Sequence, residues 1–449
     1  MLSRLRGAGI GARVLRGGAL TGLGFAASQG LRLAANLVLA RLLFPEAFGL
    51  MALVTVFMVG LAMFSDLGLG PSIQQSPRGD DPAFLRTAYT LQLLRGLVLW
   101  LAICALALPA ARFYDAPELA AMMPVAGLAL LIAGANPIRI ETAARHLVLG
   151  RLTAIDLAAQ TVGIAVMIGL ALATGSVWAL VAGGIATATA KLVLARRALP
   201  GEPDRIGWDP EAGRELIRFG KWIFLSTACG FMLAQGDKAI LGRFLTMEAL
   251  GIYNIGWFVA SFPMLLAGAV VGRVMIPAYR ENPPGASSQN FARLRRLRIA
   301  INGTTLLLIA VMALGGEAIV ALLYDERYLA AGPIVVLVAC AQLPALIGLG
   351  YDLAALAAGD SRNYFLVMAA RAGTQTLGLL IGAQSAGVAG ALFGQAVAAV
   401  VVYPAIVWLA RRHRAWDAPH DIGFALAAAM LAAVALHAAW PGIISLAGS

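Results

Sequence analysis

Long apolar segments follow one another along almost the whole chain. A helix needs roughly 20 apolar residues to cross the hydrocarbon core of a bilayer, and segments of about that length alternate with short polar stretches. The sequence therefore predicts an all-α polytopic membrane protein with thirteen spans. Pro441 and Gly442 interrupt the last of them, which leaves a full, a partial or an interfacial extra C-terminal helix as alternatives. The expected spans are 17–41, 46–72, 84–108, 118–140, 151–173, 177–199, 216–244, 248–277, 293–315, 328–351, 362–382, 386–410 and 422–440.

Part of the polar pattern occurs twice. Segment 243–251 repeats segment 41–49 at five positions, with Arg, Leu, Glu, Ala and Gly at the same spacing and an offset of 202 residues. Further along, Tyr324-Asp325 repeats Tyr114-Asp115. Two six-helix bundles in the same orientation predict a parallel repeat about an axis along the membrane normal. The expected organisation is an N-terminal bundle at 1–199, a cytoplasmic linker at 200–215, a C-terminal bundle at 216–410, and a basic segment with the extra helix at 411–449.

Composition and charge support this layout and set its orientation. Hydrophobic residues make up 60% of the chain and charged residues 13%, with a mean hydropathy of +0.82, which excludes an ordinary soluble core. If the N-terminus is cytoplasmic, 27 of the 34 Lys and Arg residues fall on inner segments, as the positive-inside rule requires. The net charge of +11 then belongs mostly to the cytoplasmic face and its contact with anionic lipids, and nucleic-acid binding is not indicated.

The sequence contains no pattern typical of catalysis or metal binding. Its three cysteines and four histidines are scattered, so disulfides and metal sites are not expected. A phosphate-binding glycine loop, a nucleophile elbow and a zinc-type helix signature are all missing. We therefore expect a transporter without a cofactor rather than an enzyme. No cleavable signal peptide is evident, so the first helix is expected to remain as an anchor.

Ionisable residues inside predicted spans are the candidates for function, because charges within a bilayer are costly. Arg95 lies deepest, at roughly 16–20 Å from either end of its helix by the helical rise. It should face the bundle interior or a wet cavity, either as a bidentate contact for pyrophosphate or in a structural ion pair. Arg371, with Gln375 one turn further on, offers the same two alternatives.

The first helix carries a polar face within an otherwise apolar segment. Gln29 and Asn36 flank Arg32 at helical spacing, so the three side chains lie on one side. This arrangement favours a surface turned to a cavity, with hydrogen bonding to a neighbouring helix as the alternative.

The seventh helix adds a second group of candidates. Lys238 shares a face with Gln235 and is expected to line the same cavity. Asp237 points about 100° away from Lys238, so the two are not expected to pair. Asp237 is a candidate proton or sodium site, or the structural partner of an arginine. Asp66 and Arg273 lie near inner helix ends, where ion coupling, gating or interfacial anchoring is expected.

Several of these segments resemble a known family. RLLFPEAFGLM (41–51), GRFLTMEALGIYNIG (242–256), QGDKAILGRFL (235–245) and SDLGLGPSIQQ (65–75) are similar to the polysaccharide transporter family of oligosaccharide flippases. That family belongs to a superfamily that includes multidrug and toxin extrusion transporters and lipid II flippases. The resemblance extends from about Leu20 to Trp408.

The resemblance implies two six-helix bundles around a central cavity that opens alternately to each side of the bacterial cytoplasmic (inner) membrane. It implies as substrate an oligosaccharide on a polyprenyl-pyrophosphate carrier, moved to the outer leaflet for O-antigen, capsule or exopolysaccharide synthesis. A polymerase and a chain-length regulator of the same pathway are implied as partners. Two alternatives remain, a cation-coupled multidrug exporter of the same superfamily and a membrane-embedded glycan polymerase or ligase. The basic deep residues disfavour the first, and the lack of a large outer loop disfavours the second.

Overall fold

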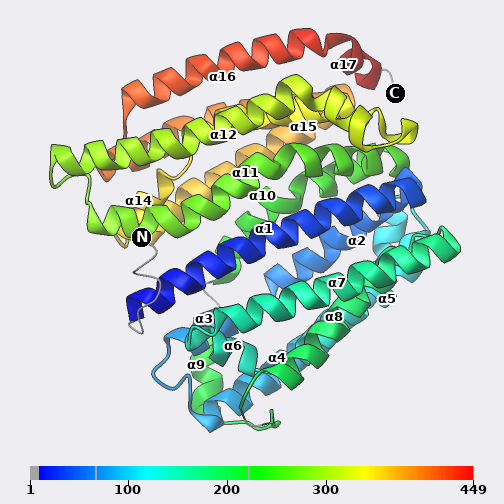
Figure 1. Ribbon diagram of the computed structural model, residues 1–449, viewed down its shortest axis with the longest axis vertical. Helices are drawn as coiled ribbons and strands as arrows, with labels where there is room; N and C mark the ends of the chain where they lie inside the picture. Colours follow the sequence, from blue (N-terminus) through cyan, green and yellow to red (C-terminus); the bar gives the residue numbers. More distant parts are fainter. Residues whose placement is uncertain (1–9, 66–67, 202, 221–222, 448–449) are drawn as a thin grey trace. The chain divides into compact units, whose positions relative to one another are not determined.

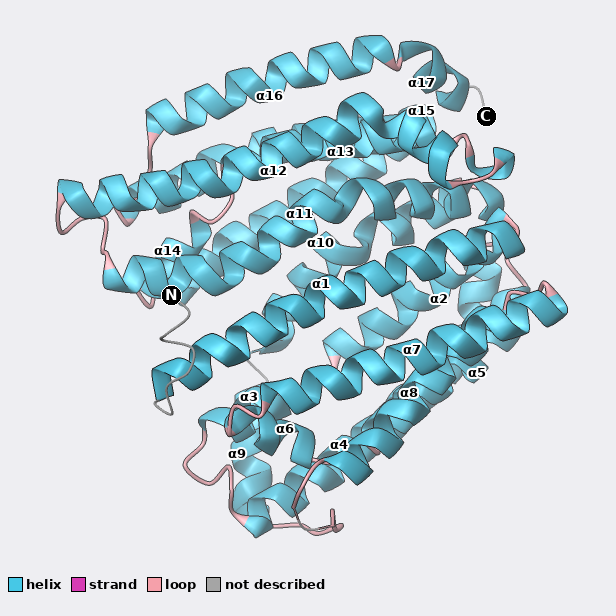
Figure 2. Ribbon diagram, viewed as in Figure 1, coloured by secondary structure: helices cyan, strands magenta, loops and turns pink. Residues whose placement is uncertain are grey.

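The computed structural model describes residues 10–65, 68–201, 203–220 and 223–447. Every regular element in these ranges is a helix, and none is a strand (Figure 2), which confirms the predicted all-α class. The chain divides into two compact units, Met1–Ala228 and Cys229–Ser449.

The N-terminal unit combines long apolar helices with three short ones. In it, α7 packs along α8 and α1, and α4 packs along α5 (Figure 1). Its helices are α1 (Ile10–Leu42), α2 (Pro45–Phe64), α3 (Leu69–Gln75), α4 (Pro82–Phe113), α5 (Glu118–Gly134), α6 (Arg139–Arg145), α7 (Leu149–Thr174), α8 (Trp178–Ala198) and α9 (Pro210–Gly220).

The C-terminal unit is organised around α13, of whose 17 residues 13 are buried. α13 packs against α11, α12, α15 and α16. The helices are α10 (Ile223–Phe244), which begins just before the unit boundary, α11 (Met247–Glu281), α12 (Ser288–Leu323), the 3-10 helix η2 (Glu326–Tyr328), α13 (Ala331–Ile347), α14 (Asp352–Ala357), α15 (Ser361–Arg412), α16 (Ala418–Ala438) and α17 (Trp440–Ala447).

Ten helices of the described chain are long and apolar enough to cross a membrane, or eleven if the bent pair α5 and α6 counts as one span. α15 covers two of the predicted spans, 362–382 and 386–410. These form two arms of the helix, which meet where the backbone is not helical, at Ala386 and Gly387. The extra C-terminal helix, α16, is among the ten. Pro441 lies in the first turn of α17, where a proline interrupts no helical hydrogen bond.

The duplication seen in the sequence recurs in the element bounds. α1 ends at Leu42 and α2 begins at Pro45; α10 ends and α11 begins 202 residues later in each case. Glu46 and Glu248 lie in the first turns of α2 and α11, as predicted. An acidic side chain is favourable there because the helix dipole is positive at its N-terminus.

The two arms of α15 pack backbone against backbone. Gly378 and Gly382 on the first arm face Gly394 and Gly390 on the second, and a Cβ built on any of the four lies 2.0–2.3 Å from the opposite carbonyl oxygen. The two glycines on each arm have the G-x-x-x-G spacing that lets membrane helices approach closely. Gly387, at φ +54°, supplies the left-handed turn between the arms.

Three predicted spans are interrupted, contrary to expectation. Span 46–72 is split into α2 and α3 near Gly68, which has φ +61°; span 118–140 is split into α5 and α6 before Arg139; and span 328–351 ends in a break after α13. Proline lacks a backbone N–H, and glycine tolerates non-helical angles. Hydropathy averaged over a segment does not reflect either effect, so the sequence did not predict these helix breaks.

Helix α9 covers the end of the predicted linker (200–215) and the start of the predicted seventh span. Residues 210–220 form the separate helix α9, whose Ala212 and Leu216 are fully buried with Phe84 of α4. Thr90 of α4 donates to the carbonyl of Gly207 at 2.8 Å and accepts from its N–H at 3.0 Å. The segment after α8 is therefore docked on the N-terminal unit, which extends to Ala228. The domain bounds expected from the sequence stay predictions.

Asp209 is expected to hold α9 in place. Arg78 Nη2 donates to Asp209 Oδ2 at 2.8 Å, and this hydrogen bond holds the pKa of the Asp209 carboxyl below its ordinary value. Because the pKa of Asp209 is lower in the folded protein, its ionised carboxylate stabilises the docked helix at pH values above the unfolded pKa. This stabilisation is lost as the pH falls, so docking should weaken below about pH 4.

Asp209→Asn should accelerate limited proteolysis within 203–220 at neutral pH. Glu211→Gln is the matched control, because its carboxylate lies 3.8 Å from Arg78 and is largely exposed. Equal cleavage rates for Asp209→Asn and the wild type would show that the pair does not hold the helix.

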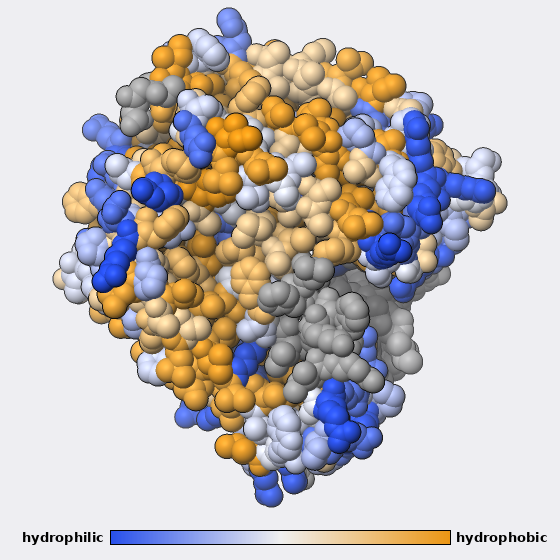
Figure 3. Space-filling view, turned by 180° about the vertical axis from the view of Figure 1, so that it is seen from behind, coloured by the Kyte–Doolittle hydropathy of each residue, from blue (hydrophilic) through white to orange (hydrophobic). Residues whose placement is uncertain are grey.

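α16 has one apolar outer face and one inner face of small residues. Ala428 and Ala435 are buried with Ile309 of α12 and Leu343 of α13. Figure 3 shows hydrophobic side chains over much of one face of the molecule, as contact with lipid requires. The large exposed side chains on the outer face of α16 are Ile422, Leu426, Met430 and Val434.

Candidate functional site

The N-terminal unit contains a polar cavity of about 430 Å³ at two helix breaks. One wall is the break between α2 and α3, another is the break between α5 and α6, and α4 closes the cavity with Gln92 and Arg95. Broken helices expose backbone groups inside a membrane, and such groups must be hydrogen-bonded or hydrated. In transporters, discontinuous helices of this kind often form substrate sites.

Arg95 and Gln92 satisfy the free carbonyls at these breaks. Arg95 Nη2 donates to the carbonyl of Ala62 at 2.7 Å, and its Nε donates to Ser65 Oγ at 3.0 Å. Gln92 Nε2 donates to the carbonyls of Gly134 and Asn136 at 3.1 and 2.8 Å. A cation at the C-terminal end of α2 also suits the helix dipole. Arg95 thus lines a cavity and caps a helix as well.

Of the residues that the structure describes, two cations and one carboxylate line this cavity, namely Arg95, Lys191 and Glu141. Lys191 Nζ also lies 2.7 Å from Asp156 Oδ1, outside the lining. Asn136 contributes a buried Oδ1 that has no hydrogen-bond partner in the described chain. The arrangement could bind an anionic group, with further polar contacts around it.

The C-terminal unit contains a second cavity, of about 310 Å³, between α10, α11, α13 and both arms of α15, whose lining combines apolar and polar residues. Arg371 lines it, and no hydrogen bond or ion pair of this side chain is found within the described ranges. Gln375 donates from Nε2 to the carbonyl of Leu233 at 3.4 Å. The other polar lining residues are Asp237, Ser261, Gln342 and Gln395.

Asp237 and Lys238 contradict the expectation that they do not pair. Lys238 Nζ lies 3.7 Å from Asp237 Oδ2, because the long lysine side chain spans the 100° that separates the two Cβ directions. Asp237 also accepts a hydrogen bond from Tyr253 at 2.7 Å. Its partners are therefore a lysine and a tyrosine rather than an arginine. Lys238 is 5% exposed, lies 3.6 Å from the centroid of the Trp257 ring and is not among the cavity lining.

The remaining candidates stay predictions. On α1, Arg32 is exposed, and Gln29 and Asn36 are half-buried. Gln235 on α10 has a buried Oε1 without a partner in the described chain, and Arg273 on α11 is exposed. These five residues line neither of the two cavities. Asp66 lies outside the described residues.

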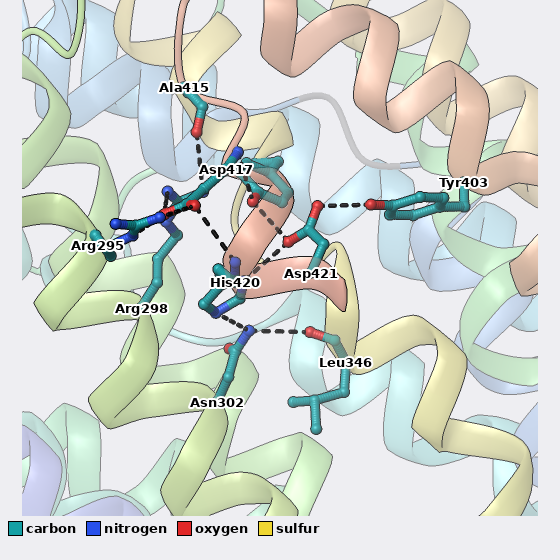
Figure 4. A network of polar contacts seen from close by, with 10 residues as sticks. Arg295, Arg298, Asn302, Leu346, Tyr403, Ala415, Asp417, His420 and Asp421 are labelled. Atoms are coloured by element: carbon teal, nitrogen blue, oxygen red, sulfur yellow. Dashed lines mark hydrogen bonds and ion pairs between the residues drawn. The ribbon is translucent and has the colours of Figure 1, made fainter. Parts of the chain in front are cut away.

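A third polar cluster ties α16 to the rest of the C-terminal unit (Figure 4). Arg295 of α12 donates from Nε and Nη2 to the two oxygens of Asp417, at 2.5 Å each. Arg298 Nη2 lies 3.5 Å from the same carboxylate, and its Nη1 donates to the carbonyl of Ala415 at 2.9 Å. Both Arg298 and Asp417 are 2% exposed.

Asp421 forms the other half of this cluster. Its carboxylate accepts from Tyr351 at 2.7 Å and from Tyr403 at 2.6 Å, and His420 Nδ1 lies 2.8 Å from Oδ1. His420 Nε2 is 3.5 Å from Asn302 Nδ2, so a neutral imidazole can donate at one nitrogen and accept at the other. Two arginines and two carboxylates therefore balance within one network, in which Arg298, Asp417 and Asp421 are buried.

Sequence reasoning did not single out Gln342, Gln395, Lys191 or this network. The network had a readable signal, because Asp417 and Asp421 are four residues apart at the start of an apolar span, where acidic side chains need partners. Gln342 and Gln395 had a weaker sequence signal, because each is an isolated amide within an apolar segment.

Comparison with known proteins gives relatives by sequence. The teichuronic acid biosynthesis protein TuaB of Bacillus subtilis (strain 168) is 22% identical over 277 residues, which are 60% of this chain and 56% of that protein. The succinoglycan biosynthesis transport protein ExoT of Rhizobium meliloti (strain 1021) is 23% identical over 319 residues, 70% of this chain and 63% of that protein. The matched region thus spans less than two thirds of either relative.

Solved structures show a similar fold. The lipid II flippase MurJ, in an inward closed conformation, has a TM-score of 0.69 at 10% identity, covering 94% of this chain and 97% of that one. A multidrug resistance MATE family transporter of the MOP superfamily, in its inward-facing conformation, has a TM-score of 0.63 at 17% identity, covering 86% and 95%. The predicted MATE-like fold is confirmed.

Residues 38–333 match the model of the family described as "Polysaccharide biosynthesis protein". This match covers most of both predicted bundles and includes both copies of the repeated turn. It agrees with the family resemblance of the segments quoted from the sequence. This chain therefore belongs to that family of polysaccharide biosynthesis proteins, and it is a multi-pass membrane protein.

Proposed function

We propose that this protein is a flippase for lipid-linked oligosaccharides. The observation that carries the proposal is an arginine that lines a cavity within each of the two units, Arg95 in one and Arg371 in the other. A substrate carried on a polyprenyl pyrophosphate presents phosphate oxygens, and a guanidinium binds such oxygens with charge-assisted, often bidentate hydrogen bonds. Arg371 has such donors available, whereas Arg95 already uses two of its donors on a helix end.

The relatives and the fold support the same function. TuaB and ExoT are named for the biosynthesis of polysaccharides, ExoT as a transport protein, and MurJ is a lipid II flippase. We place this chain in the bacterial cytoplasmic membrane with its N-terminus inside, and the carrier-linked glycan moves from the inner to the outer leaflet by alternating access. A polymerase and a chain-length regulator would then act on the product.

The fold also matches a multidrug transporter, so drug export is the competing function. Among the described residues, Asp237 is the only carboxylate that lines the C-terminal cavity, and it is already paired with Lys238 and Tyr253. A cavity for cationic drugs calls for free carboxylates. This observation favours the glycan substrate. Asp237 stays a prediction as an ion-coupling site, together with Asp66 and Arg273.

Arg371→Gln tests the function directly. In a strain from which the gene is deleted, this variant should restore surface polysaccharide at a rate roughly tenfold or more below that of the wild type, since a hydrogen bond to a charged group contributes about 1.5–3 kcal/mol. The measurement is surface polymer per cell at matched protein level in the membrane. Arg362→Gln, an exposed arginine on the same helix, is the control and should behave as the wild type.

Two outcomes would decide against the proposal. One is a deletion strain that makes normal surface polymer but becomes sensitive to cationic drugs. The other is full polymer synthesis with Arg371→Gln, which would remove the role of the guanidinium while leaving the family intact.

A further inference from the structure

The C-terminal cavity differs in chemistry from the N-terminal one. Three amide side chains, Gln342, Gln375 and Gln395, converge on it from α13 and the two arms of α15, together with the hydroxyl of Ser261 from α11. The formal charges of its described lining residues are those of Arg371 and Asp237, which cancel. A site for a multiply charged anion would have an excess of cations, so the amides point to a ligand that is polar but largely uncharged.

Gln342 makes this case most sharply. Its side chain lines the cavity, the residue is only 8% exposed, and its Oε1 is buried without a hydrogen-bond partner in the described chain. No hydrogen bond of this amide to any described group is found. Polar groups left unpaired inside a membrane helix are costly, so a ligand or water must satisfy the amide in the working protein.

The ligand that satisfies such amides must both donate and accept. Phosphate and carboxylate oxygens can only accept, and they would pair with an amide –NH₂ but not with its oxygen. A hydroxyl group does both, and it can pair with a glutamine whichever way the amide is turned. Several hydroxyls on one rigid ring would match three amides and a serine.

Trp257 adds the apolar surface that a sugar ring requires. Its side chain lines the cavity, while the ammonium of Lys238 lies 3.6 Å from the ring centroid. Sugars present C–H groups on their faces, and aromatic rings contact such surfaces well. The cavity volume of about 310 Å³ lies at the lower end of the roughly 300–1,000 Å³ typical of small-molecule sites. This volume suits a single ring rather than a whole lipid-linked oligosaccharide.

We propose that this cavity is a carbohydrate subsite in which Gln342, Gln375, Gln395 and Ser261 bind hydroxyl groups of one sugar unit against Trp257. The proposal rests on the proposed function and names the part of the substrate that the C-terminal unit recognises. Selectivity for the glycan then lies in the amides, and Arg371, which lines the same cavity, contacts a neighbouring anionic group of the substrate.

Gln342→Leu in the full chain, reconstituted in lipid nanodiscs, tests the subsite. The probes are the methyl glycosides of glucose, galactose, N-acetylglucosamine and glucuronic acid, titrated by saturation-transfer NMR, with inorganic pyrophosphate as a separate probe. We expect at least one glycoside to bind the wild type. Its Kd should rise roughly two- to tenfold in Gln342→Leu, as expected for one lost neutral hydrogen bond. Gln395→Leu should have a similar effect and serves as the second variant if Gln342→Leu does not fold.

Thermal stability separates a binding role from a structural one. Gln342→Leu should keep or raise the Tm, because it removes a buried group without a partner. Gln160→Leu is the matched control, a membrane-helix glutamine that bonds Ser28 and lines neither of the two cavities. It should lower the Tm and leave the glycoside Kd unchanged.

The subsite is overturned if no glycoside binds the wild type, or if both leucine variants bind the glycoside as tightly as the wild type does. It is also overturned if pyrophosphate displaces the glycoside and the variants lose affinity for pyrophosphate to the same extent as for the glycoside. The proposed function fails separately. In that case the glycoside binds and Gln342→Leu weakens it, but the deletion strain still makes normal surface polymer. Loss of polymer with Arg371→Gln and no glycoside binding would instead retain the flippase and remove the subsite.

Discussion

Gly382→Val is expected to destabilise the C-terminal unit strongly and to lower its Tm. A Cβ at this position would lie 2.0 Å from the carbonyl oxygen of Gly390 on the other arm of α15, and rigid backbone cannot move aside as a side chain can. The arms would have to separate by more than 1 Å along their shared face. Overpacking of a well-packed site costs about 1–3 kcal/mol, and contact with backbone places this variant at or above the upper end. Size-exclusion profiles and the Tm of purified protein report the effect.

Gly373→Val provides the matched control for this prediction. Gly373 lies on the first arm of the same helix, and a Cβ built there meets nothing within 4 Å. Valine changes helix propensity equally at both positions, so any difference in Tm between the two variants measures the packing of the arms. A Tm for Gly382→Val equal to that of Gly373→Val would contradict the close approach.

Asp417→Ala should destabilise the protein by about 3–5 kcal/mol, because it leaves a buried cation without its partner. Arg298 is 2% exposed, and Asp417 is the carboxylate within 4.0 Å of it. Arg295 would lose both of its hydrogen bonds as well, but its side chain is 38% exposed and can turn to solvent. Thermal unfolding in detergent or nanodiscs measures the loss. Asp360→Asn, a change in a more exposed carboxylate that pairs with His413, should have a much smaller effect.

The same carboxylate sets a pH dependence. Burial acts to raise the pKa of Asp417, but the hydrogen bonds from Arg295 and the His420 N–H, with the charge of Arg298, leave its pKa below the ordinary value. The stabilisation is therefore present above an unfolded pKa of about 3.9 and is lost as the pH falls through the folded pKa. Between pH 7 and pH 5 the Tm difference between wild type and Asp417→Ala should stay constant. A difference that already vanished at pH 5 would rule out this account.

Hydropathy and repetition were sufficient for the architecture. Thirteen apolar segments and one duplicated turn predicted an all-α membrane protein with two related halves, because lipid exposure and helix length act on every span in the same way. The repeated turn was predictable in detail, with Glu46 and Glu248 in the first turns of their helices. The breaks at Gly68 and before Arg139 were missed, since each depends on one or two residues that hardly change the average hydropathy.

The sequence was sufficient to predict which residues are candidates for the sites, but not which groups surround them. Arg95 and Arg371 were predicted as candidates because they lie far from the ends of their predicted spans, and each lines a cavity. Their partners could not be predicted, because they depend on the rotation of each helix about its own axis. The pairing of Asp237 with Lys238 was excluded wrongly, since Cβ directions alone do not describe how far a lysine reaches. The substrate-binding roles assigned from sequence remain predictions.

The salt-bridged start of α16 has a consequence for how the two halves can be compared. α12 carries Arg295 and Arg298, and both pair with the carboxylate of Asp417, which lies outside the predicted six-helix bundles. The C-terminal copy of the repeat is therefore electrostatically incomplete on its own. A chain that stopped at Arg412 would leave the buried guanidinium of Arg298 without the Asp417 carboxylate, so the segment that begins α16 supplies a counter-ion that the helices before it need.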